Sequence, residues 1–238
     1  MVPARYVLPL QPPFVDAIPS SETLWRFAAL ADGLLSPYAG LVRAGVSPGT
    51  VCVVLGQGVR ASLAAVVAEA MGLYVVQFSA EEQRLLDPAA TRRRVADLAT
   101  AQGLSMAGAA IVETVGSDAA RARAVLMAEP ASGVLLLERA QPFDGEHGTL
   151  PSEPAGGPQL VSLATLEHVV AMQAQVIAVA PHPDLLPELL ALCGRARIDL
   201  SIHTRAVAVK DVDSVMAARR AGQDVDLRLP IVTFDTSD

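Results

Sequence analysis

Two glycines separated by one residue mark the stretch of this sequence best suited to ligand chemistry. Gly56-Gln57-Gly58-Val59-Arg60-Ala61 follows the pattern Gly-x-Gly-x-x-Gly, with alanine in a third slot that tolerates it. Such glycines let the backbone approach a ligand, and the N–H groups that open the following helix attract a pyrophosphate. The candidate nucleotide-binding residues here are Gly56, Gly58, Val59, Arg60 and Ala61. The alternative is a turn that keeps its shape without a ligand.

The elements on either side of this turn are predicted by their composition. Residues 51–55 form an uninterrupted apolar run that is typical of a strand buried on both faces, as in parallel sheets. Residues 61–71 have a helical composition, with Leu63, Val66, Val67 and Met71 at helical spacing. Strand, glycine turn and helix together predict a site at the helix N-terminus.

The end of the second strand is where a dinucleotide site usually has an acidic residue, about 20 residues after the glycines, for a ribose 2′-hydroxyl. We expect this strand at residues 74–78, and Ser79 follows it. Glu81 and Glu82 come slightly later than that position. The pattern therefore predicts no carboxylate at the expected point.

The rest of the chain repeats the alternation of strands and helices. Asp87-Pro88 is expected to end a short helix, and a longer helix to begin near Thr91; Ser117 is expected to cap the next helix. Further elements are expected at strands 109–112, 134–137, 175–179, 202–209 and 229–234 and at helices 185–193 and 211–221. This order predicts an α/β fold with a doubly wound, mostly parallel sheet of the Rossmann kind.

Other polar residues offer weaker signals. Arg92, Arg93 and Arg94 are expected on a solvated helix face, the alternative being that one of them contacts a phosphate. A long proline- and glycine-rich segment at 138–159 is expected to be a loop. The histidines stand apart from carboxylates or nucleophiles at motif spacing and are expected to be structural or solvated; they are His147, His168, His182 and His203. We assign no catalytic residue and no metal site.

Composition limits the class of protein. The 238 residues are 52% hydrophobic and 4% aromatic, which suits helices packed on a sheet in one large or two small domains. A net charge of −7 argues against a nucleic-acid partner, and no apolar run reaches the roughly 18 residues of a membrane span. Cys52 and Cys193 are expected to be buried thiols in a reducing compartment. Without a visible secretory signal, we expect a cytoplasmic protein.

Several segments resemble the cofactor-binding half of the medium-chain, zinc-type alcohol dehydrogenases. Residues 35–49 are similar to the helix before that family's first Rossmann strand, and residues 198–222 to its last helix and strand. The sequence of residues 32–49 and 161–200 is most similar to that of the 6-hydroxycyclohex-1-ene-1-carbonyl-CoA dehydrogenases. The resemblance implies an N-terminal arm with hinge helices at 1–46 and a dinucleotide-binding-like Rossmann domain at 47–238.

Departures from the family pattern bear on the expected chemistry. The sequence lacks the family's GroES-like domain, and although Asp32 matches a late zinc ligand, we expect no zinc. Val59 adds a side chain where the pyrophosphate would approach, while Arg60 would meet a phosphate or face water. Ser79 in place of the acid, with Arg84 nearby, would favour NADP over NAD.

Three functions follow from this resemblance. The first is a degenerate, truncated dehydrogenase-like protein, a pseudoenzyme that acts as a scaffold, subunit or regulator. The alternative is an NAD(P)-binding oxidoreductase subunit completed by a partner chain. Acyl-CoA binding is a third, drawn from the subfamily resemblance. Superfamily members often pair through the edge of the sheet, so a homo-oligomer joined by residues 161–179, or a partner protein, is expected.

Overall fold

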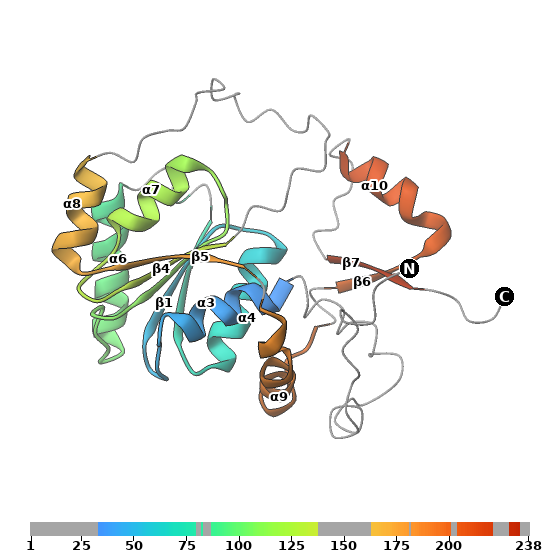
Figure 1. The fold of residues 1–238 in the computed structure, drawn as a ribbon, viewed down its shortest axis with the longest axis horizontal. Helices are drawn as coiled ribbons and strands as arrows, with labels where there is room; N and C mark the ends of the chain where they lie inside the picture. The colour runs from blue at the N-terminus through green and yellow to red at the C-terminus, as the bar shows by residue number, and fades with distance from the viewer. Residues whose placement is uncertain are drawn as a thin grey trace.

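The computed structural model describes residues 33–79, 82, 87–137, 163–180, 182–200, 204–220 and 229–233. Its centre is a five-stranded sheet in the order β2-β1-β3-β4-β5, and every neighbouring pair is parallel. The strands are β1 (Val51–Leu55), β2 (Tyr74–Phe78), β3 (Ala110–Glu113), β4 (Gly133–Leu137) and β5 (Gln175–Val179). The predicted α/β fold with a doubly wound parallel sheet is confirmed (Figure 1).

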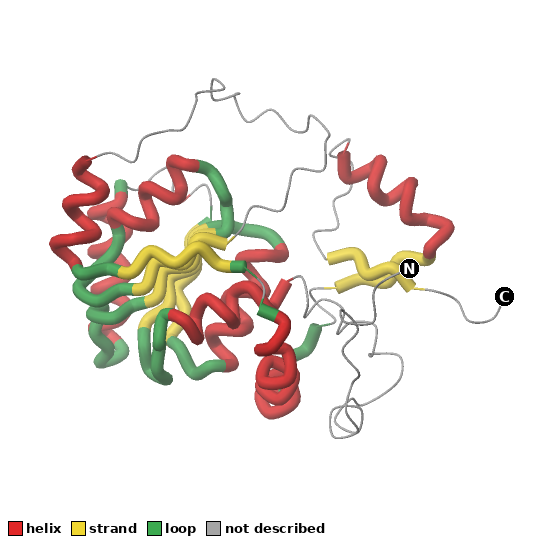
Figure 2. Tube along the Cα trace, in the orientation of Figure 1, coloured by secondary structure: helices red, strands yellow, loops and turns green. Residues whose placement is uncertain are grey.

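Helices cover both faces of this sheet (Figure 2). On one face lie α3 (Leu35–Arg43), α4 (Val59–Ala70) and α9 (Leu186–Ala196), and on the other α6 (Pro88–Ala101), α7 (Asp118–Leu126) and α8 (Leu163–Met172). β1 packs against the helices on both faces. Cys52 and Val54 lie in the core with α3, α4 and α9, whereas Val51, Val53 and Leu55 lie in the core with α6 and α7. All five β1 residues are buried, as the uninterrupted apolar run predicts.

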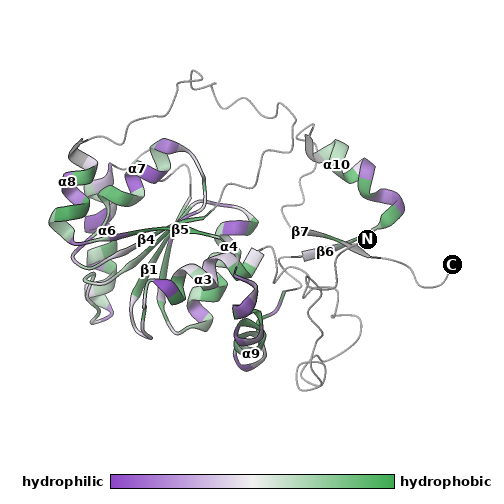
Figure 3. Ribbon diagram, in the orientation of Figure 1, coloured by the Kyte–Doolittle hydropathy of each residue, from purple (hydrophilic) through white to green (hydrophobic). Residues whose placement is uncertain are grey.

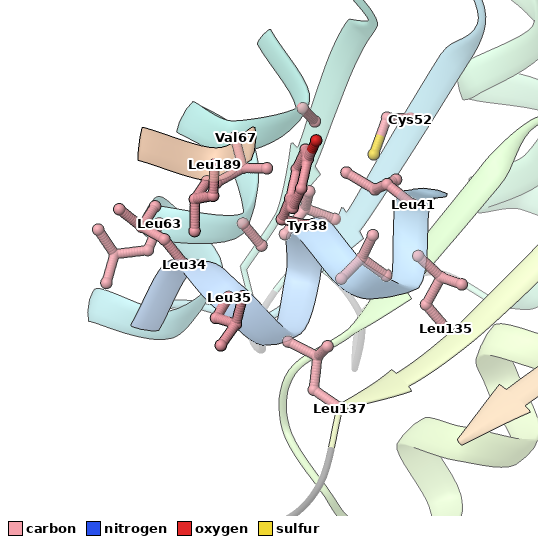
Figure 4. Packing of buried hydrophobic residues seen from close by; sticks show 14 of the residues in the cluster. Leu34, Leu35, Tyr38, Leu41, Cys52, Leu63, Val67, Leu135, Leu137 and Leu189 are labelled. Atoms are coloured by element: carbon pink, nitrogen blue, oxygen red, sulfur yellow. The ribbon is translucent and has the colours of Figure 1, made fainter. Parts of the chain in front are cut away.

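The first of these two cores joins α3, α4 and α9 to the sheet (Figure 4). Leu41, Leu63, Leu135 and Leu189 are all fully buried in it. Burying one such side chain contributes about 1.5–3 kcal/mol. Gly40 lets α3 approach the sheet closely, because a Cβ there would lie 2.9 Å from Val179 Cγ2. The helices around the sheet are two-sided in hydropathy, as expected for such a layer (Figure 3).

Two helix starts test the sequence-based boundaries. α6 begins at Pro88, so the expected start near Thr91 is wrong. Asp87 caps α6, because its carboxylate Oδ1 accepts a 2.6 Å hydrogen bond from Ala90 N; the short helix expected before Asp87-Pro88 falls mostly on residues outside the described ranges. Proline fits the first helical position, where its missing N–H would have no partner. Ser117 caps α7 as predicted, accepting from Ala120 N at 3.2 Å.

The last described elements form a second, two-stranded sheet. β6 (Thr204–Ala208) and β7 (Leu229–Thr233) pair in parallel with each other and with no strand of the first sheet, and α10 (Val212–Arg220) precedes β7. The division into an arm at 1–46 and a domain at 47–238 stays a prediction, since residues 1–32 lie outside the described ranges. The expected loop at 138–159 lies outside them too.

Both cysteines are buried, as predicted. Burial raises the pKa of the Cys52 thiol and of the Cys193 thiol to about 12 each, so neither is a reactive thiolate near neutral pH. Among the helices that the structure describes, none has both the length and the hydropathy of a membrane-crossing segment.

Candidate functional site

The strand order reverses between β1 and β3. The chain moves from β1 to β2 on one side and then crosses to β3, β4 and β5 on the other. In open α/β sheets, ligands bind outside the carboxyl ends of the strands at such a switch point. Two hydrogen bonds hold the three neighbouring strand ends together: Gly56 N donates to Phe78 O at 2.9 Å and Thr114 N to Leu55 O at 3.0 Å. The predicted glycine turn therefore lies at the switch point.

Gly56 is required by packing. It is buried, has a φ of +141°, and a Cβ at this position would collide with Thr114 Oγ1. That hydroxyl is fixed, because it donates a 3.0 Å hydrogen bond to Leu55 O. The turn would thus need glycine at position 56 even if no ligand bound there.

Gly58 is placed differently. It is the residue before the first turn of α4, its φ is +81°, and no atom of the described residues lies within 4 Å of where a Cβ would be. No side chain caps α4, and its first turn contains no acidic residue, in contrast to the caps on α6 and α7. The start of α4 therefore offers backbone N–H groups and the positive end of a helix dipole beside open space.

The remaining residues of the motif belong partly to the core. Val59 is half-buried and packs against the first core cluster, and its expected effect on an approaching pyrophosphate stays a prediction. Ala61 is fully buried, and its small size lets α4 lie close to the sheet. Arg60 is half-buried in the first turn of α4. Arg84 lies outside the described residues.

A carboxylate does lie at the end of β2. Glu82 Oε2 accepts a 2.9 Å hydrogen bond from Ser79 N, and Ser79 Oγ accepts a 3.2 Å bond from Glu82 N. These reciprocal bonds are a capping box. They lower the pKa of Glu82, which keeps the carboxylate ionised at neutral pH. We missed this group although Ser-x-x-Glu, the sequence signature of the box, spans residues 79–82.

Glu113 is a second functional candidate that sequence analysis missed. It ends β3 at the switch point and is 0% exposed. Its Oε1 accepts hydrogen bonds from Val115 N at 2.5 Å and Gly116 N at 2.8 Å, while Oε2 is buried and has no hydrogen-bond partner within the described chain. Burial raises the pKa of Glu113, against the effect of those two bonds and of the Arg121 charge. No sequence signal distinguished Glu113 from an ordinary exposed carboxylate at the end of a strand.

The described histidines have ordinary surroundings. A ring nitrogen of His168 lies 3.0 Å from Ala128 O, and exposed His182 lies 3.7 Å from Asp184. His147 and His203 lie outside the described residues, as does Asp32. Within the described ranges, no three histidine, cysteine, aspartate or glutamate side chains are grouped to hold a metal ion. The expectation about zinc stays a prediction.

Comparisons with known proteins locate this fold. No protein-family profile and no curated protein matches the sequence. Solved structures do match: cinnamyl alcohol dehydrogenase from Sorghum bicolor has a TM-score of 0.60 at 17% identity, covering 91% of this chain and 56% of its own. Benzyl alcohol dehydrogenase from Acinetobacter calcoaceticus matches with a TM-score of 0.64 at 13% identity, covering 92% of this chain and 59% of its own. The alcohol dehydrogenase from Thermus sp. ATN1 matches with a TM-score of 0.60 at 18% identity, covering 88% of this chain and 60% of its own.

The described structure thus has an alcohol dehydrogenase-like, Rossmann-type fold. The chain spans less than two thirds of the length of these dehydrogenases. This agrees with the expected resemblance to one half of such an enzyme. Because the sequence identities are 13–18%, the likeness shows the fold alone and not the activity.

Proposed function

We propose that this chain is the nucleotide-binding unit of an alcohol dehydrogenase-like oxidoreductase, and that it takes the pyrophosphate of NAD(P) at the turn between β1 and α4. The observation that carries the proposal is Gly58, which opens an uncapped helix beside open space at the switch point. The backbone N–H groups at the start of this helix are suited to bind an anion.

The chain's own groups have defined roles in this proposal. Gly58 and the first N–H groups of α4 bind the diphosphate, and buried Ala61 holds the helix close enough to the sheet to direct them. NAD(P) supplies the hydride chemistry when it is bound. Groups that act on an alcohol would come from a partner chain or from outside the described residues.

Replacing Gly58 with alanine tests the site. The new Cβ meets no protein atom but points into the space where the diphosphate would approach, and the positive φ costs about 1–2 kcal/mol. We expect nucleotide affinity, measured by NADH and NADPH fluorescence titration and by calorimetry, to fall at least about tenfold.

Gly103→Ala is the matched control. Gly103 has a φ of +71° and equally open surroundings, but it follows α6 rather than β1. It should lose similar stability and keep wild-type affinity. If the wild type bound neither nucleotide at millimolar concentration, or if Gly58→Ala bound as tightly as the wild type, the proposal would be abandoned.

A second candidate is the non-catalytic scaffold, subunit or regulator. Two observations favour it: Gly56 is explained by packing without a ligand, and among the described strands β5 is a sheet edge that pairs with β4 alone. Apolar side chains stay exposed along this edge and on α8, with Leu166 50%, Val170 76% and Val176 45% exposed. A second copy of the chain, or a partner protein, would cover them.

Light scattering tests this assembly. We expect a wild-type dimer that Val176→Glu, a charge on the edge strand, converts to monomer. Val209→Glu alters an equally exposed valine outside the five-stranded sheet and should leave the dimer intact. A monomeric wild type at tens of micromolar would rule out self-assembly through this edge.

The finer parts of the family resemblance also stay proposals. Acyl-CoA binding is proposed from the resemblance of residues 32–49 and 161–200 to the 6-hydroxycyclohex-1-ene-1-carbonyl-CoA dehydrogenases. A cytoplasmic location is proposed from the two free, buried cysteines, which fit a reducing compartment.

A further inference from the structure

Residues 114–116, which follow β3, form a wall beside the glycine turn. Thr114 N and Thr114 Oγ1 both donate to Leu55 O at 3.0 Å, which ties the wall to the strand that leads into the turn. Val115 is exposed, and its Cγ2 lies 3.5 Å from the position that a Cβ on Gly56 would take. A nucleotide bound at the turn would therefore have this wall as a neighbour.

The carboxyl group of Glu113 holds the wall in place. Its Oε1 accepts hydrogen bonds from Val115 N at 2.5 Å and from Gly116 N at 2.8 Å, so one oxygen atom fixes two successive peptide groups. Gly116 has a φ of +80°, a conformation that glycine adopts without strain. The shape of the wall thus depends on the Glu113 side chain.

The second oxygen of this carboxyl group is suited to carry a proton. Oε2 is buried and has no hydrogen-bond partner in the part of the chain that the structure describes. The register neighbours of Glu113 are apolar: Leu55 on β1 and Leu136 on β4. A negative charge is costly in such surroundings, and burial raises the pKa of Glu113 despite the two hydrogen bonds to Oε1.

α7 contributes charged groups to the surroundings of Glu113. The Arg121 charge lowers the pKa of Glu113, but by less than burial raises it. Arg121 Nη1 also lies 3.9 Å from Asp118 Oδ1, which offsets part of the arginine's charge. Beside β2, on the far side of β1, Glu82 Oε1 and Arg94 Nη1 lie 3.6 Å apart and offset each other. A negative charge on Glu113 would therefore be only partly compensated.

We propose that Glu113 is a positioning residue that makes nucleotide binding at the β1–α4 turn depend on pH. The inference rests on the proposed function. The neutral carboxyl group holds the wall without adding charge, whereas the ionised group places a negative charge beside the bound diphosphate, and the two repel each other in a partly buried site. Nucleotide binding therefore favours the neutral form, and a proton taken up from water stays on Oε2 while the nucleotide is bound. By linkage, each ligand strengthens the binding of the other by the same factor.

Glu113→Gln separates the proton from the hydrogen bonds. Glutamine stays neutral, and its side-chain oxygen is still an acceptor for Val115 N and Gly116 N. We measure the affinity for NAD by calorimetry from pH 5 to 8 at fixed ionic strength. If NADP binds more tightly, it replaces NAD, because its own ionisation affects the wild type and the variant alike.

The wild-type affinity is expected to fall about tenfold as pH rises through the folded pKa of Glu113, since a one-unit pKa shift on binding corresponds to a factor of ten. Glu113→Gln should match the wild type at the acidic end and keep that affinity at the alkaline end. Calorimetry in buffers of different ionisation enthalpy should show more proton uptake by the wild type than by the variant.

Two further variants test the cause. Arg121→Gln removes the positive charge that acts on Glu113, so the fall in affinity should move to higher pH. Glu129→Gln is the control, because Glu129 Oε1 pairs with Arg92 Nε at 3.2 Å and makes no hydrogen bond to the wall. It should keep the wild-type profile.

The outcomes separate the two proposals. Parallel pH profiles of the wild type and Glu113→Gln, or equal proton uptake, would overturn the role of Glu113 while nucleotide binding stood. If Glu113→Gln did not fold, the wild type alone would decide, since NAD binding without proton uptake across the range would overturn the inference. A wild type that bound neither NAD nor NADP would overturn both proposals.

Discussion

Gly56→Ala is expected to lower the free energy of unfolding by about 2–4 kcal/mol, because it combines overpacking with a strained backbone. The added Cβ collides with Thr114 Oγ1, and a φ of +141° is unfavourable for any residue with a side chain. Urea denaturation of the variant and the wild type measures the loss. A variant within 0.5 kcal/mol of the wild type, by the same measure, would show that the turn relaxes around the methyl group.

A second substitution tests the stated cause. Thr114→Ala removes the hydroxyl that the new methyl group meets, and the Thr114 Cβ that remains is 3.4 Å away. Alone it loses the hydrogen bond to Leu55 O, a cost of about 1 kcal/mol. The double variant should therefore be more stable than the sum of the two single losses predicts. Additive losses would place the cost of Gly56→Ala in the backbone strain alone.

Glu113→Ala is expected to cost a comparable amount, about 2–4 kcal/mol. Two backbone donors after β3, Val115 N and Gly116 N, lose their acceptor in this variant, and the side chain leaves a buried gap. Denaturant unfolding measures the loss. A loss below about 1 kcal/mol would mean that other acceptors replace the carboxylate.

Glu113→Gln should change how stability depends on pH. The folded pKa of Glu113 is raised above its ordinary value of 4.5, mainly by burial, so the folded state holds the proton more tightly than the unfolded chain. The stabilisation from this proton is complete below about pH 4.5 and is lost as pH rises through the folded pKa. Glutamine stays neutral and keeps the accepting oxygen.

The comparison is a pair of unfolding free energies measured from pH 4 to 8. Relative to Glu113→Gln, the wild type should weaken as pH rises above the unfolded value. A constant difference across this range would show that Glu113 is not held in its protonated form by the fold.

Local patterns in the sequence determined much of the architecture. The apolar run at 51–55 predicted a strand buried on both faces, and residues 175–179 were expected as a strand with the bounds that β5 has. Hydrophobic burial drives these elements, and its signal lies within a few consecutive residues. The caps are equally local: Ser117 was predicted to cap α7, whereas the capping box Ser-x-x-Glu at 79–82 carried a signal that we overlooked.

The site depended on contacts that no local pattern contains. Gly56 needs its lack of a side chain because of Thr114, whose hydroxyl bonds to a strand 59 residues earlier in the chain. Glu113 became a buried carboxylate because the crossover from β2 brings β3 against β1. Sequence alone determined which segments become strands and helices, since propensity and periodicity act over short range. Only the tertiary structure decided which strand ends meet, because strand order is set by packing between distant segments.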